Sequence, residues 1–437
     1  MDWLLVLFLV VGGLLFLVLW GVPVAFGFFT VSLLASILVL DIDTGPRQVV
    51  LNTPPKIALF SLVPVPLFIF MGELLFHSGL ASRGLNAMSK WMGRVPGRLG
   101  VLSMGGGAFF GVMSGSALAN TSLLGTLLLP EMREKGYSKS LSAGSVMGAG
   151  PLALMLPPSA LAVLLGTIGQ IPVGPLLLAA TVPGLLLALL NVIYIITRAK
   201  LDPSQAPSYD LEVASWGEKF TALFRDILPL LSIFLIVMGS IVLGIATPTE
   251  AAALGALASV LLIVVYGEFR VSRFVKAMAG TVRISGMILL IMAAASGYAA
   301  MLAFTGATRE LLAVISSADV APIMIIVFMI LVVILLGAPL EQVSLMLITL
   351  PIFVPVVDEL GFNIVWFGVL MLLTLDIAGL TPPLGLTLFV LKGVAPEDFT
   401  MGDVMRAGVP FALIDVLLIF MLFIYTPIAL WLPSVFL

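Results

Sequence analysis

Small polar side chains interrupt a long apolar stretch of the sequence near its first quarter. The interruption contains Ser114, Gly115 and Ser116, with Asn120 and Thr121 one turn further on. Hydroxyl and amide oxygens, together with backbone carbonyls that a sharp turn leaves free, are ligands for a hard cation such as sodium. The helix that starts after such a turn also offers N–H groups to a carboxylate. We therefore predict an ion and carboxylate site at this turn.

Three further apolar stretches are interrupted in a similar way. Proline removes a backbone donor and clashes with the preceding turn, so inside a bilayer such a break survives only where protein or water satisfies the freed groups. For one break alone, close packing of helices by small residues is an equally good interpretation. Four breaks at matching positions of the two halves favour a binding site for ion and substrate over simple packing. The residues at the other three breaks are Pro157, Pro158 and Ser159, then Gly337, Ala338 and Pro339, then Thr381, Pro382 and Pro383.

Carboxylates inside apolar stretches are costly and are usually paired or functional. We favour a functional role for Asp376, because it stands five residues before the break at Thr381. Glu250 follows Thr247-Pro248, which is typical of a helix start, so capping is the better interpretation there. The carboxylates of this kind are Glu73, Glu250, Glu341, Asp376 and Asp415.

The composition requires most of the chain to face lipid. Of 437 residues 61% are hydrophobic and only 10% are charged, with a mean hydropathy of +1.23. A soluble chain has about a quarter of its residues charged. The net charge of −3 indicates no nucleic-acid partner. With no cysteine and one histidine, His77, the chain offers little to an intramembrane enzyme, and we predict that it is not one.

The apolar stretches give a count of membrane crossings and reveal an internal duplication. Adding 225 to a position in the first half repeatedly gives the same residue type in the second, as expected for a repeat. The matching pairs are Pro23 and Pro248, Gly72 and Gly297, Pro130 and Pro355, Gly136 and Gly361, Pro157 and Pro382, and Pro158 and Pro383. Ordinary spans of suitable length are predicted at 3–20, 22–40, 57–76, 173–197, 228–246, 250–266, 278–303 and 410–435.

We predict an all-α integral membrane protein with two inverted repeats, each of about five transmembrane crossings plus one re-entrant helical hairpin. The repeats are joined by a polar cytoplasmic linker at 198–227. The first repeat, 1–197, comprises scaffold spans at 1–99, a hairpin and broken helix at 100–172, and a closing span at 173–197. The second, 228–437, comprises scaffold spans at 228–303, a hairpin and broken helix at 320–392, and a last span at 408–437.

This arrangement separates the basic residues strongly. Of the 20 Lys and Arg residues, seventeen fall on one side of the membrane and three on the other, and the positive-inside rule makes the richer side cytoplasmic. Both termini then face the periplasm of a bacterial inner membrane. Inverted repeats with broken helices are the signature of secondary transporters. The run of Gly105, Gly106 and Gly107 lacks phosphate-loop spacing, which argues against direct use of ATP.

The sequence resembles a known family over essentially its whole length: the large membrane subunit of tripartite ATP-independent periplasmic (TRAP) transporters. The order and spacing of several short stretches carry this resemblance. They are PLFIFMGELLFHSGLASR at 66–83, FFGVMSGSALANTSLLGTLLLPEMREKGYSKS at 109–140, LPPS at 156–159, ATPTEAAA at 246–253 and the run at 350–394 containing TPPLGLTLFV.

The resemblance implies an elevator mechanism driven by sodium ions. It also implies a small four-helix membrane subunit, a soluble periplasmic substrate-binding protein and an organic acid substrate. Together with the breaks, it leads us to predict substrate contacts at Ser114, Gly115, Ser116, Asn120, Pro157, Ser159, Asp376, Thr381 and Pro382. The predicted sodium ligands are Ser114, Ser116, Gly150, Gly337, Ala338, Thr374 and Thr381.

Two features depart from the family pattern, and both lie near the second expected sodium site. Many relatives have Gly followed by Asn and an aromatic residue where this chain has Gly337-Ala338-Pro339, and many have Asn at the position of Thr374. The alternative function is a stand-alone ion-coupled anion transporter that needs no binding protein. Copurification with a small four-helix protein would separate the two.

Overall fold

The computed structural model describes residues 8–114, 116–207, 214–306, 310, 313, 320–337 and 340–436. Every regular element in these ranges is helical. A helix satisfies its own backbone donors and acceptors, which is what an apolar chain in lipid requires. The predicted all-α class is therefore confirmed for the part of the chain that the structure describes.

The first half of the chain forms mostly apolar helices separated by short turns. After a π-helical turn at Phe8–Gly12, the helices are α2 (Gly13–Leu19), α3 (Val24–Val39), α4 (Thr44–Ile57), α5 (Pro64–Ser78), α6 (Leu80–Trp91), α7 (Arg98–Ser114), α8 (Ala117–Glu134), α9 (Lys139–Ala149), α10 (Leu152–Met155), α11 (Ala160–Ile168) and α12 (Val173–Leu201).

The second half starts after the segment that follows α12. Its helices are α13 (Trp216–Ala222), continued by a π-helical turn at Leu223–Ile227, then α14 (Leu228–Val242), α15 (Pro248–Val265), α16 (Val271–Phe304), α18 (Pro322–Leu336), α19 (Gln342–Glu359), α20 (Ile364–Leu380), α21 (Leu386–Val394), α22 (Met401–Ile424) and α23 (Pro427–Phe436). Residues 216–227, within the segment predicted as a linker, are thus helical.

Seven helices of the described ranges are long and apolar enough to cross a bilayer, and the bent pair α9–α10 with α11 would make eight. The two parts of that pair meet at an angle of 51°. Shorter apolar helices such as α3, α18 and α20 have 15 to 17 residues. At 1.5 Å per residue they fall short of a hydrocarbon core of about 30 Å.

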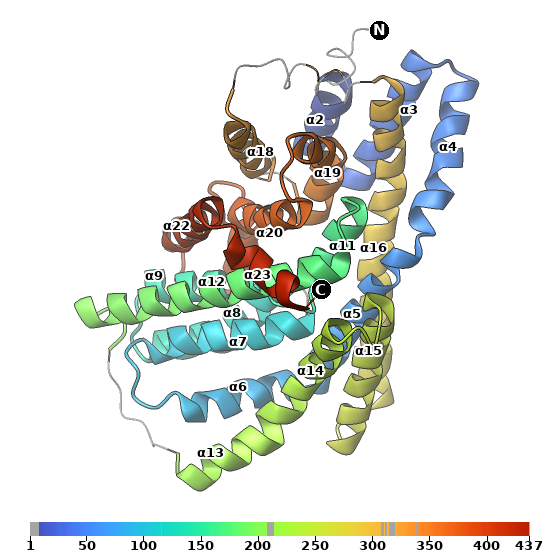
Figure 1. Ribbon diagram of the computed structural model, residues 1–437. Coiled ribbons are helices and arrows are strands. Elements are labelled where there is room, and N and C mark those ends of the chain that lie inside the picture. The colour runs from blue at the N-terminus through green and yellow to red at the C-terminus, as the bar shows by residue number, and fades with distance from the viewer. Residues whose placement is uncertain are drawn as a thin grey trace.

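The helices form two groups that lie side by side (Figure 1). In one group the long helix α16 packs against α3, α4 and α5, and α15 packs against α5 and α14. In the other, α9 packs against α7, α8 and α22, and α20 packs against α18, α22 and α12. Contacts between α5 and α7 join the groups. Two of the predicted breaks, at Pro157–Pro158 and Pro382–Pro383, lie in the second group, as do the helices that flank the other two.

Candidate ion and substrate site

The first predicted break is a sharp turn between α7 and α8. Helix α7 ends at Ser114, and α8 starts after Ser116, whose hydroxyl accepts a hydrogen bond from the Ala119 N–H at 3.3 Å. Ser116 therefore serves as the N-cap that its residue type favours. Gly115 and the side chain of Ser114 lie outside the described residues.

Glycines on α7 let this hairpin approach the broken helix of the same half. A Cβ atom at Gly107 would lie 2.5 Å from the carbonyl oxygen of Ala149, and one at Gly111 would lie 2.7 Å from the Cα atom of Ala153. Both separations are too short for a carbon side chain, so only glycine fits. The glycine-rich run of α7 is therefore a close-packing surface.

Asn120 joins α8 to this surface and to the break. Its amide nitrogen donates to the carbonyl oxygens of Gly107 at 3.0 Å, Ala149 at 3.1 Å and Gly150 at 3.4 Å. Its Oδ1 atom is buried and has no hydrogen-bond partner among the described residues. The predicted residues Asn120 and Gly150 are thus brought together.

Thr121 adds a second oxygen at the same place. Its hydroxyl oxygen is buried without a partner in the described part of the chain. It lies against Gly150, where a Cβ atom would be only 2.2 Å from it and 3.2 Å from the carbonyl oxygen of Ala117. An unpartnered buried oxygen is costly, and hard cations bind such oxygens. Sequence reasoning placed Thr121 beside the turn but did not select it as a ligand.

The first broken helix turns at its two adjacent prolines. The peptide bond between Pro157 and Pro158 is cis, and Ser159 caps α11 by accepting from the Ala162 N–H at 3.2 Å. Ser159 is 1% exposed. Helix α11 packs against α19 of the other half of the chain. The first break is thus followed by a helix that contacts the second hairpin.

The second hairpin turn lies between α18 and α19, and its residues Ala338 and Pro339 lie outside the described ranges. Glu341 is the N-cap of α19, and its carboxylate accepts from the N–H groups of Val343 at 3.2 Å and Ser344 at 2.9 Å. A carboxylate at this position suits the positive end of a helix. Glu341 therefore has a capping role.

The second break is assembled from close backbone contacts. Thr381 ends α20, and its hydroxyl donates to the carbonyl oxygen of Ile377 at 2.6 Å. The Gly385 N–H donates to the Thr381 carbonyl at 3.0 Å, and a Cβ atom at Gly385 would lie 2.3 Å from the Gly379 carbonyl oxygen. The Pro382–Pro383 peptide bond is cis. These contacts fold the chain tightly around Thr381.

A small cavity joins the second hairpin and the second break to the first hairpin. Gly337 contacts α20 so closely that a Cβ atom would be 2.3 Å from that of Ala378. Leu118 of α8 reaches the same cavity. Thr374, by contrast, is fully buried, and its hydroxyl donates to the Leu370 carbonyl. The cavity is lined by Leu118, Gly337, Leu340, Gln342, Leu345, Leu375, Ala378, Gly379, Leu386 and Thr387.

Asp376 lies behind the second break and has an acidic neighbour. It is 1% exposed, and Asp415 of α22 is 2% exposed. The two carboxyl groups are close neighbours, and the Oδ2 atom of each has no hydrogen-bond partner in the described ranges. Spacing along the sequence does not reveal this pair, because 39 positions separate its members and only the packing of α20 on α22 brings them together.

Two other polar residues in apolar stretches have local roles. Glu250 accepts from the Thr247 N–H at 2.7 Å in a capping box, so the predicted capping role is confirmed. Glu73 pairs with His77 at 3.3 Å, one turn away on α5. Within the described ranges no cluster of three or more His, Cys, Asp or Glu residues could hold a metal ion.

Long apolar helices, with two helices broken at proline pairs, are features of a multi-pass membrane protein of the transporter class. A family model described as "Tripartite ATP-independent periplasmic transporter, DctM component" matches residues 11–428. The chain therefore belongs to the DctM family of TRAP transporter large permeases, which are transport proteins and not enzymes.

Curated relatives agree with this family, and a solved transporter structure shares the fold. The chain is 30% identical over 380 residues to the C4-dicarboxylate TRAP transporter large permease protein DctM of Pseudomonas aeruginosa, covering 86% of each. It is 30% identical over 428 residues to the sialic acid TRAP transporter large permease protein SiaM of Vibrio cholerae, covering 97% of each. Its fold resembles that of the Alcanivorax borkumensis YdaH transporter, with a TM-score of 0.64 at 14% identity over 97% of this chain and 98% of that one.

Proposed function

We propose that this chain imports a small organic acid by a sodium-driven elevator mechanism, together with a small membrane subunit and a periplasmic binding protein. The observation that carries the proposal is the pair of unpartnered buried oxygens of Asn120 and Thr121 beside Gly150. They lie where the first hairpin meets the first broken helix. A sodium ion bound there would satisfy both oxygens, which otherwise remain unpaired in a poorly hydrated interior.

The helix bounds support an internal repeat, and the inversion of its second copy rests on the distribution of basic residues. Helix α8 spans Ala117–Glu134 and α19 spans Gln342–Glu359, so both ends of the two helices differ by 225 positions. The residues that cap these helices, Ser116 and Glu341, follow the same offset. So do Ser138 and Asn363, which cap α9 and α20. The cis proline pairs also match at this offset.

Contacts between the halves support a transport unit built from both. Helix α8 of the first hairpin packs against α21 of the second break, and α19 of the second hairpin packs against α11 of the first break. The repeat relates α8 to α19 and α11 to α21, so each of these two contacts is the counterpart of the other. We assign α7–α11 and α18–α21 to the moving unit, and α3–α5 with α14–α16 to the scaffold, the two groups lying side by side in Figure 1.

The chemistry of the site favours a carboxylate substrate. The N-termini of α8, α11 and α19 converge on the breaks, and helix N-termini attract anions. Among the relatives whose names state a substrate, several are named for molecules that carry a carboxylate, namely C4-dicarboxylates, sialic acid, ectoine and 2,3-diketo-L-gulonate. One is named for isethionate, whose acidic group is a sulfonate. Of the predicted substrate contacts, Ser116 and Ser159 cap these helices, so an incoming carboxylate would compete for the same N–H groups.

We place the protein in a bacterial inner membrane with both termini in the periplasm. The candidate spans Trp216–Val242, which ends in α14, and Pro248–Val265, which is α15, support a lateral partner because most of their residues are not buried inside the chain. These apolar faces need lipid or another membrane protein to cover them. A small membrane subunit on the scaffold would widen the fixed unit against which the moving unit slides.

Reconstituted uptake tests this function. In proteoliposomes that contain the chain, the small subunit and the ligand-loaded binding protein, we expect substrate uptake to require an inward sodium gradient and to ignore ATP. Uptake by this chain without the other two proteins would favour the stand-alone anion transporter. Uptake that is indifferent to sodium would overturn the coupling.

A matched pair of variants on one helix tests the ion site. Thr121→Val removes a buried, unpartnered oxygen, and loss of one such contact is worth about 1–3 kcal/mol, or roughly ten- to a hundredfold in sodium affinity. Thr126→Val is the control, because its hydroxyl bonds only the Ser122 carbonyl on the exposed side of α8. Equal sodium dependence in both variants would remove Thr121 from the site.

A further inference from the structure

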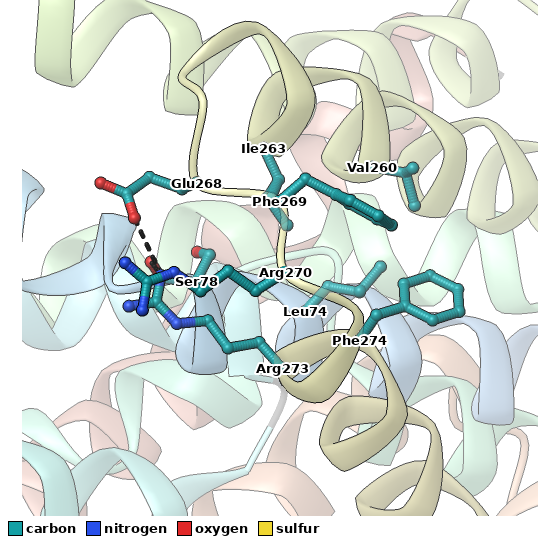
Figure 2. A pocket seen from close by; sticks show the side chains of 9 residues that line it. All are labelled: Leu74, Ser78, Val260, Ile263, Glu268, Phe269, Arg270, Arg273 and Phe274. Atoms are coloured by element: carbon teal, nitrogen blue, oxygen red, sulfur yellow. Dashed lines mark hydrogen bonds and ion pairs between the residues drawn. The ribbon is translucent and has the colours of Figure 1, made fainter.

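A shallow groove lies where α15 ends and α16 begins, apart from the four breaks. The segment 266–270 joins two candidate membrane spans, Pro248–Val265 and Val271–Phe304, so the groove must lie at a membrane surface. Figure 2 shows its lining side chains. These are Leu74, Ser78, Val260, Ile263, Glu268, Phe269, Arg270, Arg273 and Phe274.

One side of the groove is cationic. Arg273 is half-buried, and one of its guanidinium nitrogens donates to the Ser78 carbonyl at 3.0 Å and to Glu268 at 2.8 Å. Arg270 lies beside it in Figure 2 and is exposed. Glu268 balances one of the two charges, so a net positive charge remains. An arginine presents five donors in a planar fork, which leaves both residues with donors for a phosphate.

The other side of the groove is apolar. The rings of Phe269 and Phe274 lie 5.8 Å apart, and Phe274 also contacts Phe70 of α5 at 5.8 Å. Phe269 is 43% exposed. In Figure 2 these rings and Val260 lie on the side away from the guanidinium groups. The groove thus combines fixed cations with an apolar wall at one membrane surface.

The apolar wall continues along the helix toward the membrane interior. Val271, Val275 and Met278 are all exposed and recur at helical spacing on α16. Lys276, also exposed, adds a cation one turn beyond Arg273. A ligand held here would have an anionic end near the arginines and an apolar end along this stripe.

We propose that this groove binds an anionic phospholipid, with its phosphate on Arg270 and Arg273 and an acyl chain along Phe269, Phe274 and the α16 stripe. Charge complementarity selects this occupant, because Arg and Lys at a membrane surface attract anionic headgroups. A soluble anion would gain nothing from the apolar wall. A zwitterionic lipid would place the positively charged ammonium group of its own headgroup next to the two arginines, which is unfavourable.

Lipid-dependent fluorescence quenching tests the proposal directly. The chain contains no cysteine, so Ser272→Cys, at an exposed position beside the groove, allows a single fluorescent label. The full chain is reconstituted in vesicles of phosphatidylglycerol and phosphatidylcholine, with bromine atoms on the acyl chains of one lipid at a time. We expect brominated phosphatidylglycerol to quench more strongly at equal mole fraction.

Arginine variants then test whether the preference for phosphatidylglycerol comes from the groove. Each Lys or Arg near a membrane surface favours anionic lipid by about fivefold, so Arg270→Gln should reduce the preference for phosphatidylglycerol by about that factor. Arg270 has no ion pair in the described structure that the variant would break, whereas Arg273→Gln removes two hydrogen bonds. Lys392→Gln, a basic residue on α21 of the other helical group, is the control.

Three results would overturn the proposal. Equal quenching by the two lipids would mean that the groove does not select the headgroup. An unchanged preference in Arg270→Gln and in the Arg270→Gln, Arg273→Lys double variant would assign the preference to the general surface charge. Loss of all quenching once the small membrane subunit is present would mean that a protein covers the groove.

Discussion

At the scale of single residues, the absence of a side chain at Gly150 decides whether the Thr121 hydroxyl has room beside the first break. The Thr121 hydroxyl occupies the space that a methyl group on Gly150 would need, since the two would be 2.2 Å apart. The same glycine's carbonyl accepts from Asn120 at 3.4 Å. Gly150 thus makes room for one oxygen and holds the amide that carries the other.

Gly150→Ala should therefore damage the site. Inserting a methyl group into a packed interior costs about 1–3 kcal/mol, and here the group that must move is the proposed ligand Thr121. We expect a lower unfolding temperature and a higher sodium concentration for half-maximal uptake. The control is Gly286→Ala in α16, where a Cβ atom meets nothing within 4 Å. There the substitution should be neutral or slightly stabilising, and equal effects in both variants would contradict the expectation.

The buried acidic pair permits a second test at this scale. Asp415→Asn keeps a hydrogen-bonding group beside Asp376, whereas Asp415→Leu leaves the Asp376 carboxyl buried without a partner. An unsatisfied buried polar group costs about 1–3 kcal/mol. We expect thermal unfolding in detergent to show Asp415→Leu to be clearly less stable than Asp415→Asn. Equal stability would mean that Asp376 has another partner.

The residue types at the breaks could be predicted from the sequence, but their partners could not. Ser116 and Ser159 were selected because they stand at predicted breaks and carry hydroxyl oxygens, and both are N-caps in the structure. Thr121 was not selected, because nothing in its spacing indicates which backbone atoms approach it. That information depends on how closely α7 and α8 pack on the break, which Gly107 and Gly150 determine in three dimensions.

At the scale of helices, the breaks are the features that sequence reasoning located best. Proline and glycine end helices through local backbone chemistry, so Pro157 and Pro382 indicated the turns without any tertiary information. Helix α6 and the helical residues 216–227 were missed. Their polar residues resemble those of a loop, and their helical form depends on mutual packing, including the hydrogen bond from the Trp91 indole N–H to the Lys219 carbonyl at 3.1 Å.

An ionic cluster joins the two halves of the chain where α8 ends and α9 begins. Arg133 of α8 contacts Asp398 at 2.6 Å, and Lys139 of α9 lies 3.6 Å from Asp398 and 3.5 Å from Asp403. Both cations also lie over the ring of Phe399, which is 1% exposed. The first hairpin is thereby tied to the segment between α21 and α22.

Asp398→Asn should loosen this connection modestly. Partly exposed ion pairs are worth about 0.2–1 kcal/mol each, and salt screens them. We expect a small fall in the thermal unfolding midpoint at low salt that narrows at high salt. Asp358→Asn, an exposed carboxylate at the end of α19 with no ion pair among the described contacts, is the matched control. A fall in the unfolding midpoint that does not change with salt would mean that the variant disturbs the packing around Phe399 and not the ion pairs.

At the scale of the whole molecule, helix length limits what composition could establish. Ten crossings were predicted from apolar stretches, whereas seven helices of the described ranges meet the length criterion alone, or eight with the bent pair. Short helices such as α3 and α18 do not span the hydrocarbon core by themselves, so the turns that flank them must supply the rest of the crossing. The number of crossings and the sidedness of the repeats therefore remain predictions that rest on the distribution of basic residues.

Two matched positions test that sidedness. Glu134 ends α8 and Glu359 ends α19, so they occupy the same place in the two repeats, 225 positions apart. Both are exposed, and the chain has no cysteine to interfere with labelling. Inverted repeats place these residues on opposite sides of the membrane. The positive-inside rule places Glu134, which neighbours Arg133 and Lys135, in the cytoplasm.

We therefore expect an impermeant thiol reagent to label Glu359→Cys in intact spheroplasts and Glu134→Cys only after permeabilisation. The residue type, the helix position and the exposure are the same in both variants, so a difference reports the side of the membrane alone. Labelling of both variants from the same side would mean that the repeats are parallel, because an even number of crossings would then separate them. The opposite pattern would keep the inversion but reverse the orientation, and the basic clusters would then face the periplasm against their usual preference.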